Sequence, residues 1–189
     1  SNAPLKDHLI IIGFGIGGKH LARAATVAGI PYVVLEMNPD TVRKYSKMGI
    51  PIMYGDASNR AVLEHIGVHN ARVMAIVISD PMAIRRVTDI ARDMNASLHI
   101  IVRTRFMGEI ADSRDLGADT VIVEEFESSI EVFHRVLVRY LIPMEDIQRF
   151  TTEIRTEGYG MLRSLDTESN PFVSIQNHIA SIQVSTVTV

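Results

Sequence analysis

A glycine-rich motif directly after a short apolar run places the strongest constraint on how this chain folds. The run is Leu9 to Ile12, and the motif is Gly13-Phe14-Gly15-Ile16-Gly17-Gly18. An unbroken Leu-Ile-Ile-Ile run that ends in glycine is typical of a strand buried on both faces of a parallel sheet. A G-x-G-x-x-G motif binds phosphate when it connects a strand to a helix. The segment therefore predicts a strand, a tight turn and a helix whose N-terminus faces a phosphate.

Five further apolar runs of strand length follow, and helical stretches separate them. The runs are Tyr32 to Leu35, Ile50 to Met53, Val73 to Ile78, His99 to Val102 and Thr120 to Val123. Helices are expected at about 17–29, 39–48, 59–66, 81–95 and 106–116. Strict strand–helix alternation predicts right-handed crossovers. The expected fold class is α/β, a Rossmann-type doubly wound parallel sheet of six strands with helices at its C-terminal end.

Capping residues mark where several of these helices begin and end. Asn38 and Asp80 each precede a proline, which suits the first helical position because its missing N–H costs nothing there. Glycines stand where four helices are expected to end, at Gly29, Gly49, Gly67 and Gly117.

After the sixth strand the alternation stops, and residues 126–142 are predicted to form a largely apolar helix. Phe126, Ile130, Phe133, Leu137 and Leu141 share one face, and further apolar residues lie on other faces: Val132, Val136, Val138 and Ile142. A helix that is apolar over most of its circumference needs neighbours on more than one side. A second copy of the chain would cover that surface, and the alternative is that the helix after Pro143 folds back over it.

The domain organisation follows from these elements. Residues 1–7 are expected to be a tag remnant and linker, because Ser1-Asn2-Ala3 is typical of tag cleavage. The Rossmann-type nucleotide-binding domain is expected at 8–142 and a C-terminal helix at 143–165. The tail at 166–189 ends in an alternating, strand-like segment. It is either disordered or the start of a truncated second subdomain.

Composition narrows the possible function classes. The chain has no cysteine, which excludes disulfides and thiolate metal sites and favours an intracellular setting. A formal net charge of -3 gives no reason to expect nucleic acid or an anionic membrane as a partner. The longest apolar runs are far shorter than the roughly 20 residues of a membrane-spanning helix.

Polar side chains follow several of the predicted strands, at the sheet edge where open α/β sheets bind ligands. Glu36 closes the second strand and can accept hydrogen bonds from both ribose hydroxyls of an adenosine, while repelling the 2′-phosphate of NADP. Asp56 can receive the adenine amino group or order its loop, and Asp80 can act as a helix cap alone. Arg103 can reach phosphate oxygens or be an ordinary surface residue.

Other candidates are weaker, and the residues of a catalytic site are missing. A metal site at His65 and His69 is not favoured because Gly67 lies between them, and the acidic cluster at 124–127 is more simply a solvated turn. No Tyr is followed four positions later by Lys, and no catalytic triad or paired-carboxylate site is recognisable. Binding without turnover, and therefore no enzyme, is the simplest interpretation.

Taken together, these residues resemble the TrkA-N family, the regulator-of-potassium-conductance (RCK) domains. The resemblance rests on Gly13 to Gly18, Glu36, Gly55-Asp56-Ala57-Ser58, Ser79-Asp80 and Arg103, and it covers about residues 8–142. The segment from Ile147 to Leu165 is similar to the region that follows this domain in Kef-type cation/proton antiporters. Ile16-Gly17 departs from the Arg-Phe expected of the Kef-type pattern, which argues against regulation by glutathione.

The resemblance implies residue roles, a ligand and partners. Phosphate would be held by Gly13, Gly15, Ile16, Gly17 and Gly18, the ribose by Glu36, and the adenosine by Asp56, Ala57, Ser79 and Asp80. Met37, next to Glu36, would be a further cofactor-binding residue. Arg103 would meet phosphate or a neighbouring subunit. The implied ligand is NAD(H) or AMP, ADP or ATP, and the implied assembly is a homodimer through helix 126–142.

The functional expectation is a regulatory domain of a potassium channel or Kef-type antiporter that senses this ligand and controls potassium transport. Such a domain would lie on the cytoplasmic face of the membrane, beside a transmembrane transport domain. One alternative is a soluble NAD-dependent oxidoreductase, or a subunit of one, that borrows catalytic residues from a partner. A redox-sensing repressor is a third possibility, but no basic helix supports it.

Overall fold

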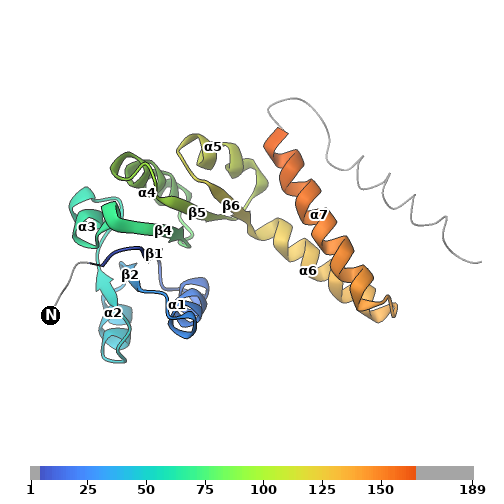
Figure 1. Cartoon of the computed structure of the whole chain (residues 1–189), viewed down its shortest axis with the longest axis horizontal. Coiled ribbons are helices and arrows are strands. Elements are labelled where there is room, and N and C mark those ends of the chain that lie inside the picture. The colour runs from blue at the N-terminus through green and yellow to red at the C-terminus, as the bar shows by residue number, and fades with distance from the viewer. Residues whose placement is uncertain (1–4, 165–189) are drawn as a thin grey trace, which may run out of the picture. The chain divides into compact units, whose positions relative to one another are not determined.

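The computed structural model describes residues 5–164, and in them all six predicted strands are present (Figure 1). They form a single parallel sheet in the order β3-β2-β1-β4-β5-β6. The strands are β1 (His8–Ile12), β2 (Tyr32–Glu36), β3 (Ile52–Tyr54), β4 (Ala71–Ile76), β5 (His99–Thr104) and β6 (Thr120–Val123). The predicted Rossmann-type sheet is confirmed.

Helices cover both faces of this sheet. In Figure 1, α1 and α2 lie on one side, and α4 and α5 lie on the other. The elements are α1 (Ile16–Ala28), α2 (Pro39–Ser46), α3 (Arg60–His65), α4 (Pro81–Met94) and α5 (Ile110–Asp115), with short 3₁₀ turns η1 (Val68–Asn70) and η2 (Met107–Glu109). The strand order reverses between β1 and β4, which is the switch point where open α/β sheets bind ligands. The glycine-rich motif lies directly after β1.

The predicted caps are also present. Asn38 Oδ1 accepts the backbone N–H groups of Asp40 and Thr41 at 3.0 Å each. Asp80 Oδ1 accepts those of Met82 and Ala83 at 2.9 and 3.2 Å. The four helix-ending glycines all have a positive φ, between 68° and 106°.

The core of the sheet domain follows from the alternation of side chains along buried strands. Leu9 and Ile11 of β1 pack with Ala22 and Ala25 of α1. Ile10 is also buried, as are His8 and Ile12, and these three residues of β1 point to the opposite face. Each fully buried Ile or Leu stabilises the fold by roughly 1.5–3 kcal/mol. A sheet buried on both faces therefore holds the glycine-rich motif on a rigid base.

Two strand boundaries differ from the sequence-based prediction in ways that matter for the site. β4 ends at Ile76, so Val77 and Ile78 lie in the loop after the strand, where both approach the glycine-rich motif. β5 continues to Thr104, so Arg103 belongs to the strand rather than following it.

The C-terminal part contains α6 (Glu124–Arg139) and α7 (Met144–Ser164), and the chain divides into two compact units between Glu127 and Ser128. The predicted helix at 126–142 starts two residues earlier, where acidic side chains favour a helix N-terminus. It ends at Arg139 because Leu141 adopts a left-handed conformation, with φ of 58°. The N–H groups of Leu141 and Ile142 then bond back to the carbonyls of Val138 and Leu137, closing the helix as a Schellman motif.

Exposure along α6 is uneven. Ile130 is buried and Phe133 and Leu137 are half-buried, whereas Leu141 is 89% exposed and does not join that face. Val132, Val136 and Val138 also remain exposed, at 64%, 46% and 40%. Among the described helices, none is long and apolar enough to cross a membrane. The strand-like tail at 182–189 lies outside the described residues.

Candidate functional site

Two glycines of the motif are required by the backbone itself. Gly13 has a φ of 97°, and a Cβ built there would lie 2.7 Å from Ile78 Cγ2. A Cβ on Gly18 would lie 2.1 Å from the carbonyl oxygen of Gly13. Any side chain at these two positions would displace the loop or the start of α1. Their role in the structure is to allow the tight turn from β1 into α1.

The other two glycines border open space. No atom lies within 4 Å of a Cβ built on Gly15, and at Gly17 the nearest are Arg103 Nη1 at 3.9 Å and Val77 Cβ at 4.0 Å. Gly15 is the N-cap of α1 and supplies no side chain to the first turn, whose N–H groups have no partners within a helix. Ile16 is 79% exposed. An anion can therefore approach the backbone of this turn closely.

Glu36 connects the end of β2 to the glycine-rich loop. Its Oε2 accepts the backbone N–H of Phe14 at 2.7 Å, and its Oε1 accepts that of Asn38 at 2.7 Å. The Phe14 side chain is buried and meets the Tyr45 ring edge-on, with centroids 4.9 Å apart. Each carboxylate oxygen has further lone pairs, so this oriented carboxylate can still accept hydroxyl hydrogens.

Asp56 and Ala57 begin the loop after β3. Asp56 Oδ1 accepts the backbone N–H and the hydroxyl of Ser58 at 2.8 and 2.7 Å. These hydrogen bonds lower the pKa of Asp56, and the nearby charge of Arg86 lowers it further. The side chain is thus an exposed, ionised acceptor whose loop is ordered by Ser58. Ala57, the next residue, is buried.

Met37, Ser79 and Asp80 occupy the same edge of the sheet. Met37 is 61% exposed, and Ser79 is also exposed. One oxygen of Asp80 is occupied as the cap of α4, as one of the two predicted alternatives requires. A capping role alone explains why an acid stands at that position.

Arg103 lies beneath the first turn of α1 and binds groups from two other segments. Its Nη2 donates to the carbonyl of Val77 at 2.9 Å, and its Nη1 forms an ion pair with Glu124 Oε1 at 2.6 Å. The Arg103 side chain is 30% exposed and that of Glu124 is 43% exposed. One cation therefore connects the loop after β4 to the first residue of α6, beside Gly17 of the glycine-rich motif.

The structure thus brings the sequence-predicted residues to one edge of the sheet, around the switch point. Sequence reasoning missed three contributors: Phe14, whose N–H binds Glu36, Arg86 near Asp56, and Glu124 as the partner of Arg103. The sequence offered two signals: Phe14 is an apolar residue inside a glycine motif, and Glu124 is an acid directly after β6. Neither signal indicates a pairing until the sheet order is known.

The weaker candidates are placed as follows. His69 Nδ1 lies 2.9 Å from the carbonyl oxygen of Met94, and His65 is exposed at the end of α3. Among residues 5–164, no group of three or more histidines and acids is arranged to hold a metal ion.

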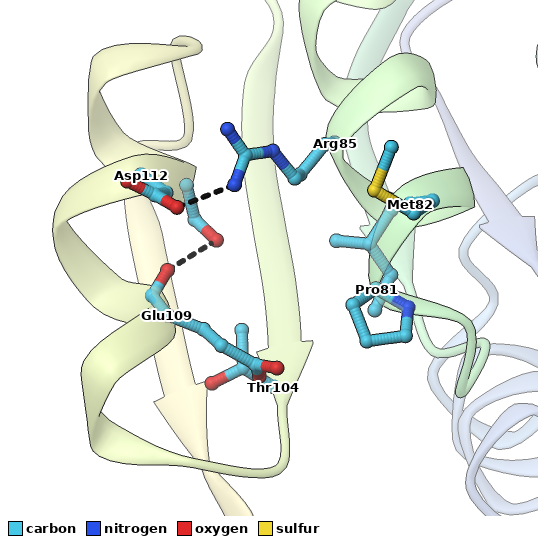
Figure 2. A pocket seen from close by; sticks show the side chains of 8 residues that line it. Pro81, Met82, Arg85, Thr104, Glu109 and Asp112 are labelled. Atoms are coloured by element: carbon cyan, nitrogen blue, oxygen red, sulfur yellow. Dashed lines mark hydrogen bonds and ion pairs between the residues drawn. The ribbon is translucent and has the colours of Figure 1, made fainter.

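A separate small pocket of about 120 Å³ opens between α4 and α5. Figure 2 shows Arg85 of α4 forming an ion pair with Asp112 of α5 across it. The Ser113 hydroxyl donates to the carbonyl of Glu109 at 2.8 Å. Met82 and Pro81 form its apolar side. None of the predicted site residues lines this pocket.

Comparison with known proteins identifies the family of this chain. The TrkA-N domain model matches residues 9–124. The chain is 29% identical over 159 residues to a putative K(+) efflux antiporter KefB of Alkalimonas amylolytica, covering 84% of this chain but only 24% of that protein.

Two solved structures show the same fold. The Kef CTD of Shewanella denitrificans in its AMP-bound form has a TM-score of 0.73 at 22% identity, over 84% of this chain and 96% of that one. The GsuK channel bound to NAD has a TM-score of 0.60 at 20% identity, over 65% of this chain and 22% of that one. From the family match, and from the Rossmann-type sheet with its glycine motif and Glu36, the chain belongs to the TrkA-N domain family.

Proposed function

We propose that this chain is a regulatory domain of a potassium channel or Kef-type cation/proton antiporter that binds NAD(H) or an adenine nucleotide and controls potassium transport. It would act on the cytoplasmic face of the membrane, joined to a transmembrane transport domain in the same or an associated chain. The antiporter relative is about four times longer than the matched segment, which leaves room for such a domain in that protein.

The observation that carries this proposal is the junction of the glycine-rich loop with Glu36. The loop offers exposed backbone at Gly15, and Glu36 is held 2.7 Å from the N–H of Phe14 in the same loop. Backbone N–H donors for a phosphate and a carboxylate acceptor for ribose hydroxyls are thus held next to each other. The AMP and NAD bound by the two structural neighbours are ligands of the same class.

Individual residues receive the following roles in this proposal. Gly15, Ile16 and Gly17 present backbone to the phosphates, with Gly13 and Gly18 shaping the turn. Glu36 and Met37 hold the ribose side, Asp56 and Ala57 with Ser79 and Asp80 border the adenosine, and Arg103 provides positive charge for the phosphates. A ligand can regulate transport only if it binds one conformation better than another, so a homodimer contact through 126–142 would transmit that difference.

Gly15→Ala tests the proposal because it separates binding from folding. The added methyl group meets no atom of the protein within 4 Å, so the fold should survive with a loss of at most about 1 kcal/mol from the altered N-cap. The same methyl group would occupy the space into which a phosphate must move. Isothermal titration calorimetry should show the affinity for NAD or ADP falling about tenfold or more.

Gly108→Ala is the matched control, since a Cβ at Gly108 also meets nothing within 4 Å but lies in η2. It should bind nucleotide like the wild type. Wild-type protein that binds none of NAD, ADP or AMP would refute the proposed function. A Gly15→Ala variant with wild-type affinity would refute the assignment of the phosphate to this loop.

A further inference from the structure

The ion pair between Arg103 and Glu124 links the candidate phosphate site to the first residue of α6. Arg103 Nη1 is the atom 3.9 Å from the Cβ position of Gly17, and the same Nη1 is 2.6 Å from Glu124 Oε1. One nitrogen therefore faces both the loop and the acid. Arg103 Nη2 is engaged separately, with the carbonyl of Val77 at 2.9 Å.

A phosphate bound at this turn and the carboxylate of Glu124 are two anions that require the same donor. Guanidinium binds carboxylate and phosphate with similar geometry, so neither anion is excluded by shape. Both side chains are less than half exposed, which weakens the screening of their charges by solvent. The carboxylate also places a negative charge beside the phosphates, which opposes their binding.

We infer that Glu124 competes with the phosphates of a bound nucleotide for Arg103, so that Glu124 limits nucleotide affinity and the start of α6 responds to occupancy. This inference rests on the proposed function. Coupling between two binding events is reciprocal: if the phosphates weaken the Arg103–Glu124 pair, that pair weakens phosphate binding by the same factor. α6 is also the helix that crosses from the first compact unit into the second.

The test is a double-mutant cycle on nucleotide affinity in the full chain. Glu124→Gln removes the competing charge and keeps the side-chain shape, so the affinity for ADP should rise about threefold to tenfold. Arg103→Gln should lower ADP affinity. In the Arg103→Gln background, the further change Glu124→Gln should give little gain, because the donor for which the two anions compete is gone.

Glu125→Gln is the control for general electrostatics, since it removes the same charge from the next residue of the same helical turn. Its effect on ADP affinity should be clearly smaller than that of Glu124→Gln. Equal gains from the two variants, or an undiminished gain from Glu124→Gln in the Arg103→Gln background, would overturn the inference while leaving the proposed function intact. Wild-type protein that binds no ADP, AMP or NAD would instead refute the proposed function.

Discussion

His8 is a buried titratable residue that serves the fold rather than the site. It begins β1, is fully buried, and its Nε2 donates to the carbonyl of Ile66 at 3.0 Å. Its Nδ1 is buried without a hydrogen-bond partner in the structure. Burial lowers the pKa of His8, although the Ile66 carbonyl and the charge of Asp7 oppose this shift. The folded chain therefore prefers the neutral ring.

This preference predicts that His8 makes the protein less stable in acid. A histidine with a lowered pKa in the fold contributes stability above its unfolded pKa of about 6.5, and that contribution is lost as the pH falls toward the lower folded value. Between pH 7.5 and pH 5.5, the melting temperature of His8→Gln should fall less than that of the wild type. The glutamine has no charge to gain but can still donate to Ile66.

His65→Gln is the control for this experiment, because His65 is exposed at the end of α3. It should keep the wild-type dependence on pH. A His8→Gln variant whose melting temperature falls as steeply with acidification as that of the wild type would show that His8 is not the responsible group.

At the scale of single elements, the sequence predicted the strands well and their ends less well. Apolar runs reveal buried strands, but an apolar residue can pack against its neighbours without belonging to a strand. Val77 and Ile78 extend the run of β4, yet they lie in the following loop and pack against the glycine-rich motif. Whether an apolar side chain packs from a strand or from a loop depends on tertiary contacts, so the local sequence does not reveal it.

The same limit applies to the candidate site. Glu36, Asp56 and Asp80 could be found because each follows a predicted strand, and parallel strands bring their carboxyl ends to one edge. The sequence could not reveal the hydrogen bond from Phe14 to Glu36 or the ion pair between Arg103 and Glu124. They depend on which strands are neighbours and on how far β5 extends.

For α6, we predict that the exposed valines form a contact between two copies of the chain. Val132 and Val136 remain 64% and 46% exposed, so covering what remains of each is worth part of the roughly 1.5–3 kcal/mol gained when a fully exposed side chain of this kind is buried. The wild type should be a dimer at micromolar concentration, and Val136→Asp should give a folded monomer. Size-exclusion chromatography with light scattering distinguishes the two states.

Gln148→Asp provides the comparison, because it adds the same charge at an exposed position of α7. It should remain dimeric. Phe133→Asp is a poorer probe, since Phe133 is half-buried within its own chain and the charge would also destabilise that packing. A monomeric wild type at this concentration would contradict the dimer and leave the proposed regulation without a route between subunits.

At the scale of the whole molecule, the proposal requires an adenine nucleotide whose ribose 2′-hydroxyl carries no phosphate. In this proposal, Glu36 discriminates between NAD and NADP, because its carboxylate suits two ribose hydroxyls and repels a 2′-phosphate. Its orientation is already set by the N–H groups of Phe14 and Asn38. Discrimination between the two dinucleotides should therefore depend on this single side chain.

Native mass spectrometry of the protein mixed with equal amounts of NAD, NADP, ADP and AMP tests the central proposal most directly. We expect wild-type chains to carry one adenine nucleotide or NAD each and to leave NADP unbound. Glu36→Ala should weaken NAD binding and remove the discrimination against NADP, while Asp40→Ala, which removes an exposed acid of α2, should change neither. Chains that remain without nucleotide, or that carry NADP as readily as NAD, would contradict it.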